Sequence, residues 1–341
     1  MVRRTITIYD IAKDLKLAPS TISKVINNKG NVSTRTRERV MEHIRKVGFV
    51  PQNSARMLKS KKSFTIGVVF SEELNIGLEH SFFSSILQHF KTYVETKGYE
   101  LSFIVTQLGD NKMSYYEWCV NKGVDGVYIV VGAYDDKGIL ELASKNIPVV
   151  STDILIDGVK TTICDNKQGI ELSLDFLYNR NKLKTVGMIH GPLNSKAFKM
   201  RYDAFYDYHK KHLLEVNEKF IVAAKSFGFS SGYVAAKQLI KQNPVLPEGL
   251  IVGSDDIALG VLKAFNDENI KIPNDIQIIG FDDIHFAEHF TPSLTTIRQD
   301  RVAIAENAAK TLLSMIEKSN QTIPDIQEIP VSLIERETTL K

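Results

Sequence analysis

The 341-residue sequence has few of the features that cross-link, anchor or export a protein. Its only two cysteines, Cys119 and Cys164, lie 45 residues apart, a spacing that supports neither a zinc site nor a disulfide framework. No run of about 20 apolar residues is present that could cross a membrane. Residues 1–5 lead into an amphipathic pattern without an apolar signal segment. We therefore expect a chain that stays in the cytoplasm.

The sequence also lacks the common catalytic motifs. It has no Walker loop, no Gly-x-Gly-x-x-Gly after a predicted strand, and no Gly-x-Ser-x-Gly nucleophile elbow. His285, Glu288 and His289 form a His-x-x-Glu-His sequence, but no further ligand supports it, and we expect no metal there. Cys119 has no visible activating neighbour. The sequence therefore predicts a protein that is not an enzyme and needs no cofactor.

Charge is distributed unevenly along the chain. Residues 1–62 hold 15 Lys and Arg against 4 Asp and Glu, a net charge of +11, so the remainder carries −8 within the total of +3. A small basic module on a mildly acidic body is typical of nucleic-acid binding. A solvated basic face without a partner would show the same charge, so this pattern favours nucleic acid without proving it.

Residues 7–48 have the apolar periodicity of three short helices. The first begins at Thr7, the second runs from Pro19 to about Asn27, and the third runs from Ser33 to Val47. Two short helices joined by a tight turn predict a helix-turn-helix, whose second helix enters the major groove of DNA. Short side chains there allow close approach. A three-helix packing module is the alternative interpretation.

Four ordered segments of this head resemble the lactose/galactose repressor (LacI/GalR) family. They are TIYDIA at residues 7–12, PSTISKVIN at 19–27, VSTRTRERV at 32–40 and, like that family's hinge, GFVPQNSARML at 48–58. The resemblance implies that bases are contacted by Pro19, Ser20 and Lys24. It implies that phosphates are held by Tyr9, Thr21, Asn27 and Ser33.

Two positions depart from the family pattern. Ala18 stands where a capping Ser or Thr is frequent, and alanine cannot cap, which costs about 1 kcal/mol of helix stability. Lys24 stands where arginine is frequent. Because lysine is a point donor that cannot form two parallel hydrogen bonds to one base, we expect this exchange to alter the preferred operator sequence.

The hinge segment should depend on DNA for its order. A helix of about seven residues, here 52–59, is marginal alone in water. The resemblance implies that Leu58 wedges between bases in the minor groove, where an apolar side chain opens a base step and kinks the duplex. A plain linker with one stray leucine is the alternative.

From Phe64 onward, strand patterns alternate with helix patterns, which predicts parallel sheets with helices on both faces. In the first series we expect strands at 65–70, 100–105, 127–131 and 148–151, with helices near 82–97 and 111–122 and from 136. In the second we expect strands at 185–189, 219–223, 249–253 and 276–281, with helices at 196–212 and 231–241 and from 256. Two such series indicate two doubly wound lobes, with a ligand between them at the carboxyl ends of the strands.

The family resemblance extends over this core and implies a periplasmic-binding-protein-like α/β fold behind an all-α helix-turn-helix headpiece. The lobes would be connected by three crossings, near residues 164, 297 and 326. We therefore expect a DNA-binding domain with its hinge helix at 1–62 and a ligand-binding and dimerisation core at 63–341. Lobe 1 would comprise about 63–164 and 298–325, and lobe 2 about 165–297 and 326–341.

Arg201 and Asp282 are the pair most expected to hold a ligand. A guanidinium and a carboxylate in one cleft can donate to and accept from vicinal hydroxyls, and Phe227 offers a flat apolar face. The resemblance adds Asp153, Phe82, Phe83 and Ser254, where Ser254 stands in a place often held by asparagine. Structural roles remain open as well, since Asp282 could cap a helix, Arg201 could pair with an acid on its own helix, and Phe227 could belong to the core.

These observations predict a ligand-responsive, sequence-specific transcription repressor. By resemblance it would bind double-stranded DNA at a near-palindromic operator as a homodimer, with a small-molecule effector, best a sugar, between the lobes. One alternative is a sugar-binding transport-type protein with the same core, which the basic head opposes. Another is a regulator that responds to a purine or to a protein partner. The third is an α/β enzyme, for which no site is evident.

Overall fold

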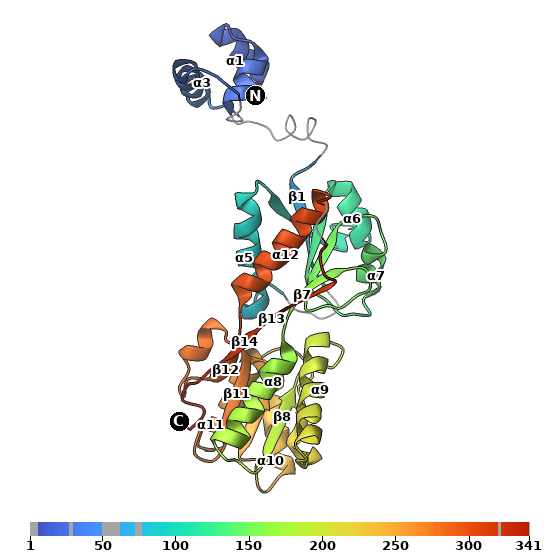
Figure 1. Ribbon diagram of the computed structural model, residues 1–341, viewed down its shortest axis with the longest axis vertical. Helices are drawn as coiled ribbons and strands as arrows, with labels where there is room; N and C mark the ends of the chain where they lie inside the picture. Colours follow the sequence, from blue (N-terminus) through green and yellow to red (C-terminus); the bar gives the residue numbers. More distant parts are fainter. Residues whose placement is uncertain (1–5, 27–29, 50–61, 72–76, 320–321, 341) are drawn as a thin grey trace. The chain divides into compact units, whose positions relative to one another are not determined.

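The computed structural model describes residues 6–26, 30–49, 62–71, 77–319 and 322–340. The chain divides into two compact units, residues 1–63 and 64–341, and Figure 1 shows the elements of each. Within the described residues, no helix is both long and apolar enough to cross a membrane.

The N-terminal unit is helical. Its helices are α1 (Ile8–Leu15), α2 (Pro19–Ile26) and α3 (Thr34–Val47). A capping box starts α1, because the Thr7 hydroxyl accepts from the Asp10 N–H while the Asp10 carboxylate accepts from the Thr7 N–H at 2.8 Å. All three helices bury apolar residues in one small core, which includes Ile11, Ile22 and Val40.

Lobe 1 of the second unit is built on a six-stranded sheet in which every pairing is parallel, in the order β13-β7-β6-β5-β1-β2. The strands are β1 (Thr65–Phe70), β2 (Glu100–Ile104), β5 (Gly126–Val131), β6 (Val149–Thr152), β7 (Lys160–Cys164) and β13 (Ile326–Ile329). The helices are α5 (Ser81–Thr96), α6 (Tyr115–Lys122), α7 (Lys137–Ala143) and α12 (Arg301–Ile316). Because successive strand residues point to opposite faces, Val68 belongs to the core that includes residues of α5 and α12, and Val69 to the core that includes residues of α6 and α7. Figure 1 labels these four helices around the sheet.

Lobe 2 repeats this design, with the sheet order β14-β12-β11-β10-β8-β9 and only β14 antiparallel to its neighbour. The strands are β8 (Val186–His190), β9 (Ile221–Ala223), β10 (Gly249–Val252), β11 (Gln277–Asp282), β12 (Thr295–Gln299) and β14 (Val331–Ile334). The helices are α8 (Asn166–Asp175), α9 (Lys196–Lys211), α10 (Phe229–Gln242) and α11 (Asp255–Asp267), and α8 continues as a π-helical turn, η2 (Phe176–Arg180). Figure 1 shows α8 beside α9, and α10 packs on α11. The predicted fold class is confirmed.

Some local predictions were wrong. The helix expected near 111–122 begins only at Tyr115, after a short hairpin of β3 (Gln107–Leu108) and β4 (Asn111–Lys112). Ser114 caps that helix in a box with Glu117, so the Ser-x-x-Glu signal marked the true start. The strand expected at 219–223 begins with a 3-10 turn, η3 (Glu218–Phe220), and only Ile221–Ala223 is extended.

The chain crosses between the lobes three times. It passes from β7 to α8 after Cys164, from β12 to α12 after Gln299, and from β13 to β14 after Ile329. The third crossing was expected near 326, but residues 326–329 pair with β7 and so extend the lobe 1 sheet, with Ile326 opposite Thr161. All three crossings lie at the carboxyl ends of lobe strands, where ligands of open α/β sheets bind.

Candidate functional site

A pocket lies between the two lobes of the core. Its walls come from the start of α5 and the ends of β5 and β6 in lobe 1, and from α9, the segment before α10 and the end of β11 in lobe 2. Six of the seven predicted effector residues line it, namely Phe82, Phe83, Asp153, Arg201, Phe227 and Asp282. A concave site between two lobes, lined by apolar rings and a few convergent polar groups, is typical of a small-molecule site.

Arg201 is fixed in place by lobe 2. The side chain projects from α9 and is 3% exposed. Its Nε donates to Oδ1 of Asn166 at 2.7 Å and its Nη1 donates to the carbonyl oxygen of Gly253 at 2.6 Å. Nη1 also lies 3.7 Å from Oδ1 of Asp282, and the guanidinium lies 3.6 Å from the centre of the Phe281 ring. These contacts hold the guanidinium in one orientation at the pocket wall.

Asp282 ends β11 with a backbone φ of 125°, a strained conformation for any residue other than glycine. Its Oδ1 accepts a hydrogen bond from Nε2 of Gln299 at 2.6 Å. Burial raises the pKa of Asp282 well above its usual range, and the positive charge of Arg201 opposes that rise. Strain of this kind at a buried, charged position is typical of a functional site.

Asp153 faces the same pocket from the end of β6 in lobe 1, also with a positive φ, of 60°. Its Oδ1 is buried and has no hydrogen-bond partner among the described residues. Burial raises the pKa of Asp153 to about 6, with Arg201 acting in the opposite direction. A buried carboxylate that is ionised at neutral pH but accepts no hydrogen bond destabilises the fold. The hydroxyl group of a ligand could donate the missing hydrogen bond.

Aromatic rings form much of the remaining wall. The Phe198 and Phe227 ring centres are 5.1 Å apart, and the His80 ring lies 4.8 Å from that of Phe83 and 6.4 Å from that of Phe227. His80 and Phe198 were not among the residues expected in the pocket from the sequence. Phe198 carried a usable signal, because it lies three residues before Arg201 on one helix and so shares its face.

His80 also forms a link between the lobes. Its Nε2 lies 3.6 Å from Oδ2 of Asp256 on α11, whereas His80 itself precedes α5 in lobe 1. Burial lowers the pKa of His80 to about 4 and raises the pKa of Asp256 to about 6, so this imidazole is neutral at pH 7. No local sequence pattern predicts this contact, because His80 and Asp256 are far apart in the chain.

Ser254 does not line the pocket. It is 3% exposed and caps α11, where its hydroxyl accepts from the N–H of Ile257 at 3.4 Å. The neighbouring Asp255 is buried and accepts from the Thr296 hydroxyl at 2.6 Å and from the N–H of Ile284 at 3.0 Å. These residues hold the start of α11 to β12 and to the turn after β11.

The residues expected at DNA lie mostly on open surface of the N-terminal unit. Pro19, Ser20 and Lys24 are exposed on α2, while Ile22 and Val25 of the same helix are buried. Thr21 is half-buried. Outside α2, Tyr9 is 74% exposed, and Ser33 is exposed and caps α3 through the N–H of Thr36. The predicted contacts Asn27 and Leu58 lie outside the described residues.

Comparison with known families matches both units. The family described as bacterial regulatory proteins, lacI family, matches residues 7–52, which include α1, α2 and α3. The N-terminal unit thus carries a lacI-family DNA-binding domain. A periplasmic binding protein-like domain matches residues 174–339 of the second unit. These matches bear out the predicted resemblance to lacI-family regulators and the predicted role of a regulator rather than an enzyme.

Individual relatives agree with this assignment. The chain is 29% identical to the HTH-type transcriptional repressor PurR of Glaesserella parasuis, over 92% of this chain and 91% of that one. It is also 29% identical to the ribose operon repressor of Halalkalibacterium halodurans, over 98% and 97% of the two chains.

Solved structures share the fold. The lac repressor dimer bound to operator and the anti-inducer ONPF is 24% identical and superposes with a TM-score of 0.83, over 99% of this chain and 100% of that one. A periplasmic binding protein/LacI transcriptional regulator of Alkaliphilus metalliredigens, in complex with D-xylulofuranose, is 27% identical with a TM-score of 0.68, over 81% and 99%.

Proposed function

We propose that this lacI-family protein is a repressor that binds a near-palindromic DNA operator through α2, and that a neutral, polyhydroxylated effector, a sugar, sets its DNA affinity from the pocket between the core lobes. The observation that carries the proposal is the convergence of Asp153, Arg201 and Asp282 on that pocket from both lobes. The protein acts in the cytoplasm as a homodimer, whose two heads read two half-sites. The lac repressor, which shares the fold, is a dimer on its operator.

The chemistry of the pocket favours a neutral ligand over an anionic one. Among the described lining residues, the charged groups are one guanidinium, of Arg201, and two carboxylates, of Asp153 and Asp282. The guanidinium already donates to Asn166 and Gly253 and lies beside the carboxyl group of Asp282, so a phosphate or carboxylate would find no cation that is not already engaged. Hydroxyl groups can both donate to the carboxylates and accept from the guanidinium, so a polyol satisfies both kinds of partner.

The aromatic walls supply the apolar part of recognition. Phe83, Phe198 and Phe227 present ring surface against which the C–H face of a sugar can pack. The same rings could stack on a purine, and several relatives are repressors named PurR. A purine is therefore the second candidate effector, and a ligand panel should contain both classes.

Coupling to DNA follows from the position of the pocket. A ligand that contacts Asp153 in lobe 1 and Arg201 in lobe 2 has a different affinity for each arrangement of the two lobes. Only such a difference in affinity can shift the equilibrium between two arrangements. The His80–Asp256 pair joins the lobes at the same place and would respond to the same movement. A coupling of about 1–3 kcal/mol is typical of such a system.

Replacement of Lys24 by alanine should test the reading of bases by α2. Lys24 is exposed on the DNA-reading helix and can donate to guanine acceptors. We expect Lys24→Ala to weaken binding to the preferred sequence by about 1–3 kcal/mol, roughly 5- to 150-fold, and binding to random DNA far less. The preferred DNA is first enriched from a random library by its binding to the full wild-type chain. Fluorescence anisotropy titrations with this DNA and with random DNA then measure both affinities.

Lys46→Ala is the matched control for this experiment, because Lys46 is an exposed lysine in the last turn of α3, outside the helix that reads bases. It should change the two affinities by the same factor. An equal loss on both DNAs in Lys24→Ala would show that Lys24 contacts phosphate and not a base.

A further inference from the structure

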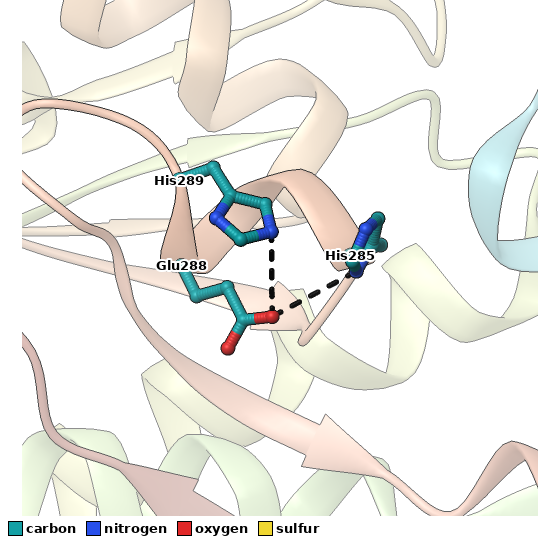
Figure 2. A group of neighbouring side chains, drawn as sticks. All are labelled: His285, Glu288 and His289. Carbon is teal, nitrogen blue, oxygen red and sulfur yellow. Dashed lines mark ion pairs between the residues drawn. The ribbon is translucent and has the colours of Figure 1, made fainter.

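The turn that follows β11 brings two histidines and a glutamate together. His285 and Glu288 are the first and last residues of a 3-10 helix, η4 (His285–Glu288), and His289 is its C-cap residue. Figure 2 shows both imidazoles beside one oxygen of Glu288, Oε1, which is 3.7 Å from Nδ1 of His285 and 3.6 Å from Nε2 of His289. Within the described part of the chain, this is the one group of three or more His, Cys, Asp or Glu whose ligand atoms lie within 4.8 Å of one another.

The helix type explains the arrangement. A 3-10 helix has three residues per turn, so His285 and Glu288 lie directly above one another. His289 follows at the end of the turn, and its ring centre lies 4.9 Å from that of His285. From the sequence no metal is expected here, because His-x-x-Glu-His lacks a further ligand. The folded turn needs none, since its three side chains already converge.

The donor atoms are close to the spacing that a zinc ion requires. Zinc binds nitrogen and carboxylate oxygen at about 2.0–2.2 Å in a tetrahedron, which separates neighbouring ligand atoms by about 3.4 Å. The two N–O distances, 3.7 and 3.6 Å, exceed this by a few tenths of an ångström. All three side chains are exposed and can rotate to close the remaining gap between the two nitrogens.

The backbone that carries these side chains is well anchored. Asp283, just before the turn, accepts from Nε of Arg298 at 2.6 Å and from Nη2 of Arg336 at 2.7 Å. Within the turn, the carbonyl oxygen of Ala287 accepts from the N–H of Leu294 at 2.8 Å. A fixed backbone reduces the ordering cost of placing three ligands around one ion.

We propose that this turn binds one Zn²⁺ ion through Nδ1 of His285, Nε2 of His289 and Oε1 of Glu288. Two imidazoles and a carboxylate form a borderline ligand set that suits zinc, and the fourth tetrahedral position is left to water. The site is separate from the effector pocket and does not depend on the proposed function.

Isothermal titration of zinc chloride into the full, tag-free chain tests the proposal. The wild type should bind one Zn²⁺ per chain, and His285→Ala/His289→Ala should weaken that event by more than about 100-fold. Glu288→Gln, which keeps the size of the side chain and removes its charge, should weaken it to a smaller extent. The altered side chains are exposed, so circular dichroism and thermal unfolding without zinc should match the wild type.

His212→Ala is the control, because His212 is an exposed histidine that ends α9 and stacks on Tyr208. It should bind zinc as the wild type does. The proposal is overturned if the wild type shows no one-to-one binding event, or if the double variant binds zinc as tightly as the wild type. Loss of the event in His212→Ala would likewise place the ion elsewhere.

Discussion

Arg201→Ala should lower the free energy of unfolding of the chain by about 3–5 kcal/mol. The side chain is 3% exposed, and its removal leaves the Gly253 carbonyl and the Asn166 amide oxygen without their donor. It also removes the cation beside the buried carboxylate of Asp282. Breaking a buried ion pair from one side is costly because the remaining charge has neither water nor a partner.

The pH dependence of this loss has a definite sign. Arg201 lowers the pKa of Asp282 and of Asp153, so it stabilises the fold while these carboxylates are ionised. Without Arg201 both carboxyls can escape the penalty by taking up a proton. The difference in stability between wild type and Arg201→Ala should therefore shrink as the pH falls from about 7.5 to about 5.

Urea denaturation followed by circular dichroism at the two pH values measures both effects. Lys199→Ala is the matched control, because Lys199 lies on the same helix, is half-exposed, and makes its ion pair with the exposed residue Asp203 at the surface. It should change stability by less than about 0.5 kcal/mol. If Arg201→Ala is no more destabilising than Lys199→Ala, the buried network around Arg201 does not exist as described.

Gly260→Ala should destabilise the core by about 3 kcal/mol. Helices α10 and α11 pack closely at two glycines. A Cβ on Gly260 would overlap the carbonyl oxygen of Phe229, and one on Gly232 would overlap that of Ile257. Backbone atoms cannot rotate away as a side chain can, so the helices must separate, and the cost outweighs the gain of about 1 kcal/mol in helix propensity.

Gly228→Ala provides the comparison for this prediction. Gly228 precedes α10, its φ is −111°, and no heavy atom lies within 4 Å of a Cβ placed there. The change should cost less than about 1 kcal/mol in the same urea titration. Similar losses in Gly228→Ala and Gly260→Ala would contradict the close helix contact.

Much of the fold could be predicted from local patterns. Continuous apolar runs such as Thr65–Phe70 and Gly249–Val252 are strands buried on both faces, and their bounds differ from the prediction by no more than a residue or two. The crossings were harder to place. Residues 326–329 could not be assigned to a lobe locally, because that depends on pairing with β7, more than 150 residues earlier.

The candidate site was predictable to a similar degree. Arg201 and Asp282 could be proposed from chemistry and resemblance, and the structure brings both to one pocket. The strained φ of Asp282 and the His80–Asp256 contact could not be predicted from the sequence, because both arise only when distant elements pack. Ser254 shows the opposite case, since the resemblance implied a place in the pocket but its side chain caps a helix instead.

The most direct test of the account is the DNA affinity of the full chain in the presence of candidate effectors. Anisotropy titrations on the enriched DNA would be run with neutral sugars, nucleosides and their phosphorylated or carboxylated counterparts, on wild type and on Asp282→Asn. We predict that one neutral compound changes the wild-type Kd by about 5- to 150-fold, and that Asp282→Asn abolishes the change. A panel without effect, a response only to anionic compounds, or a response that survives in Asp282→Asn would contradict the account.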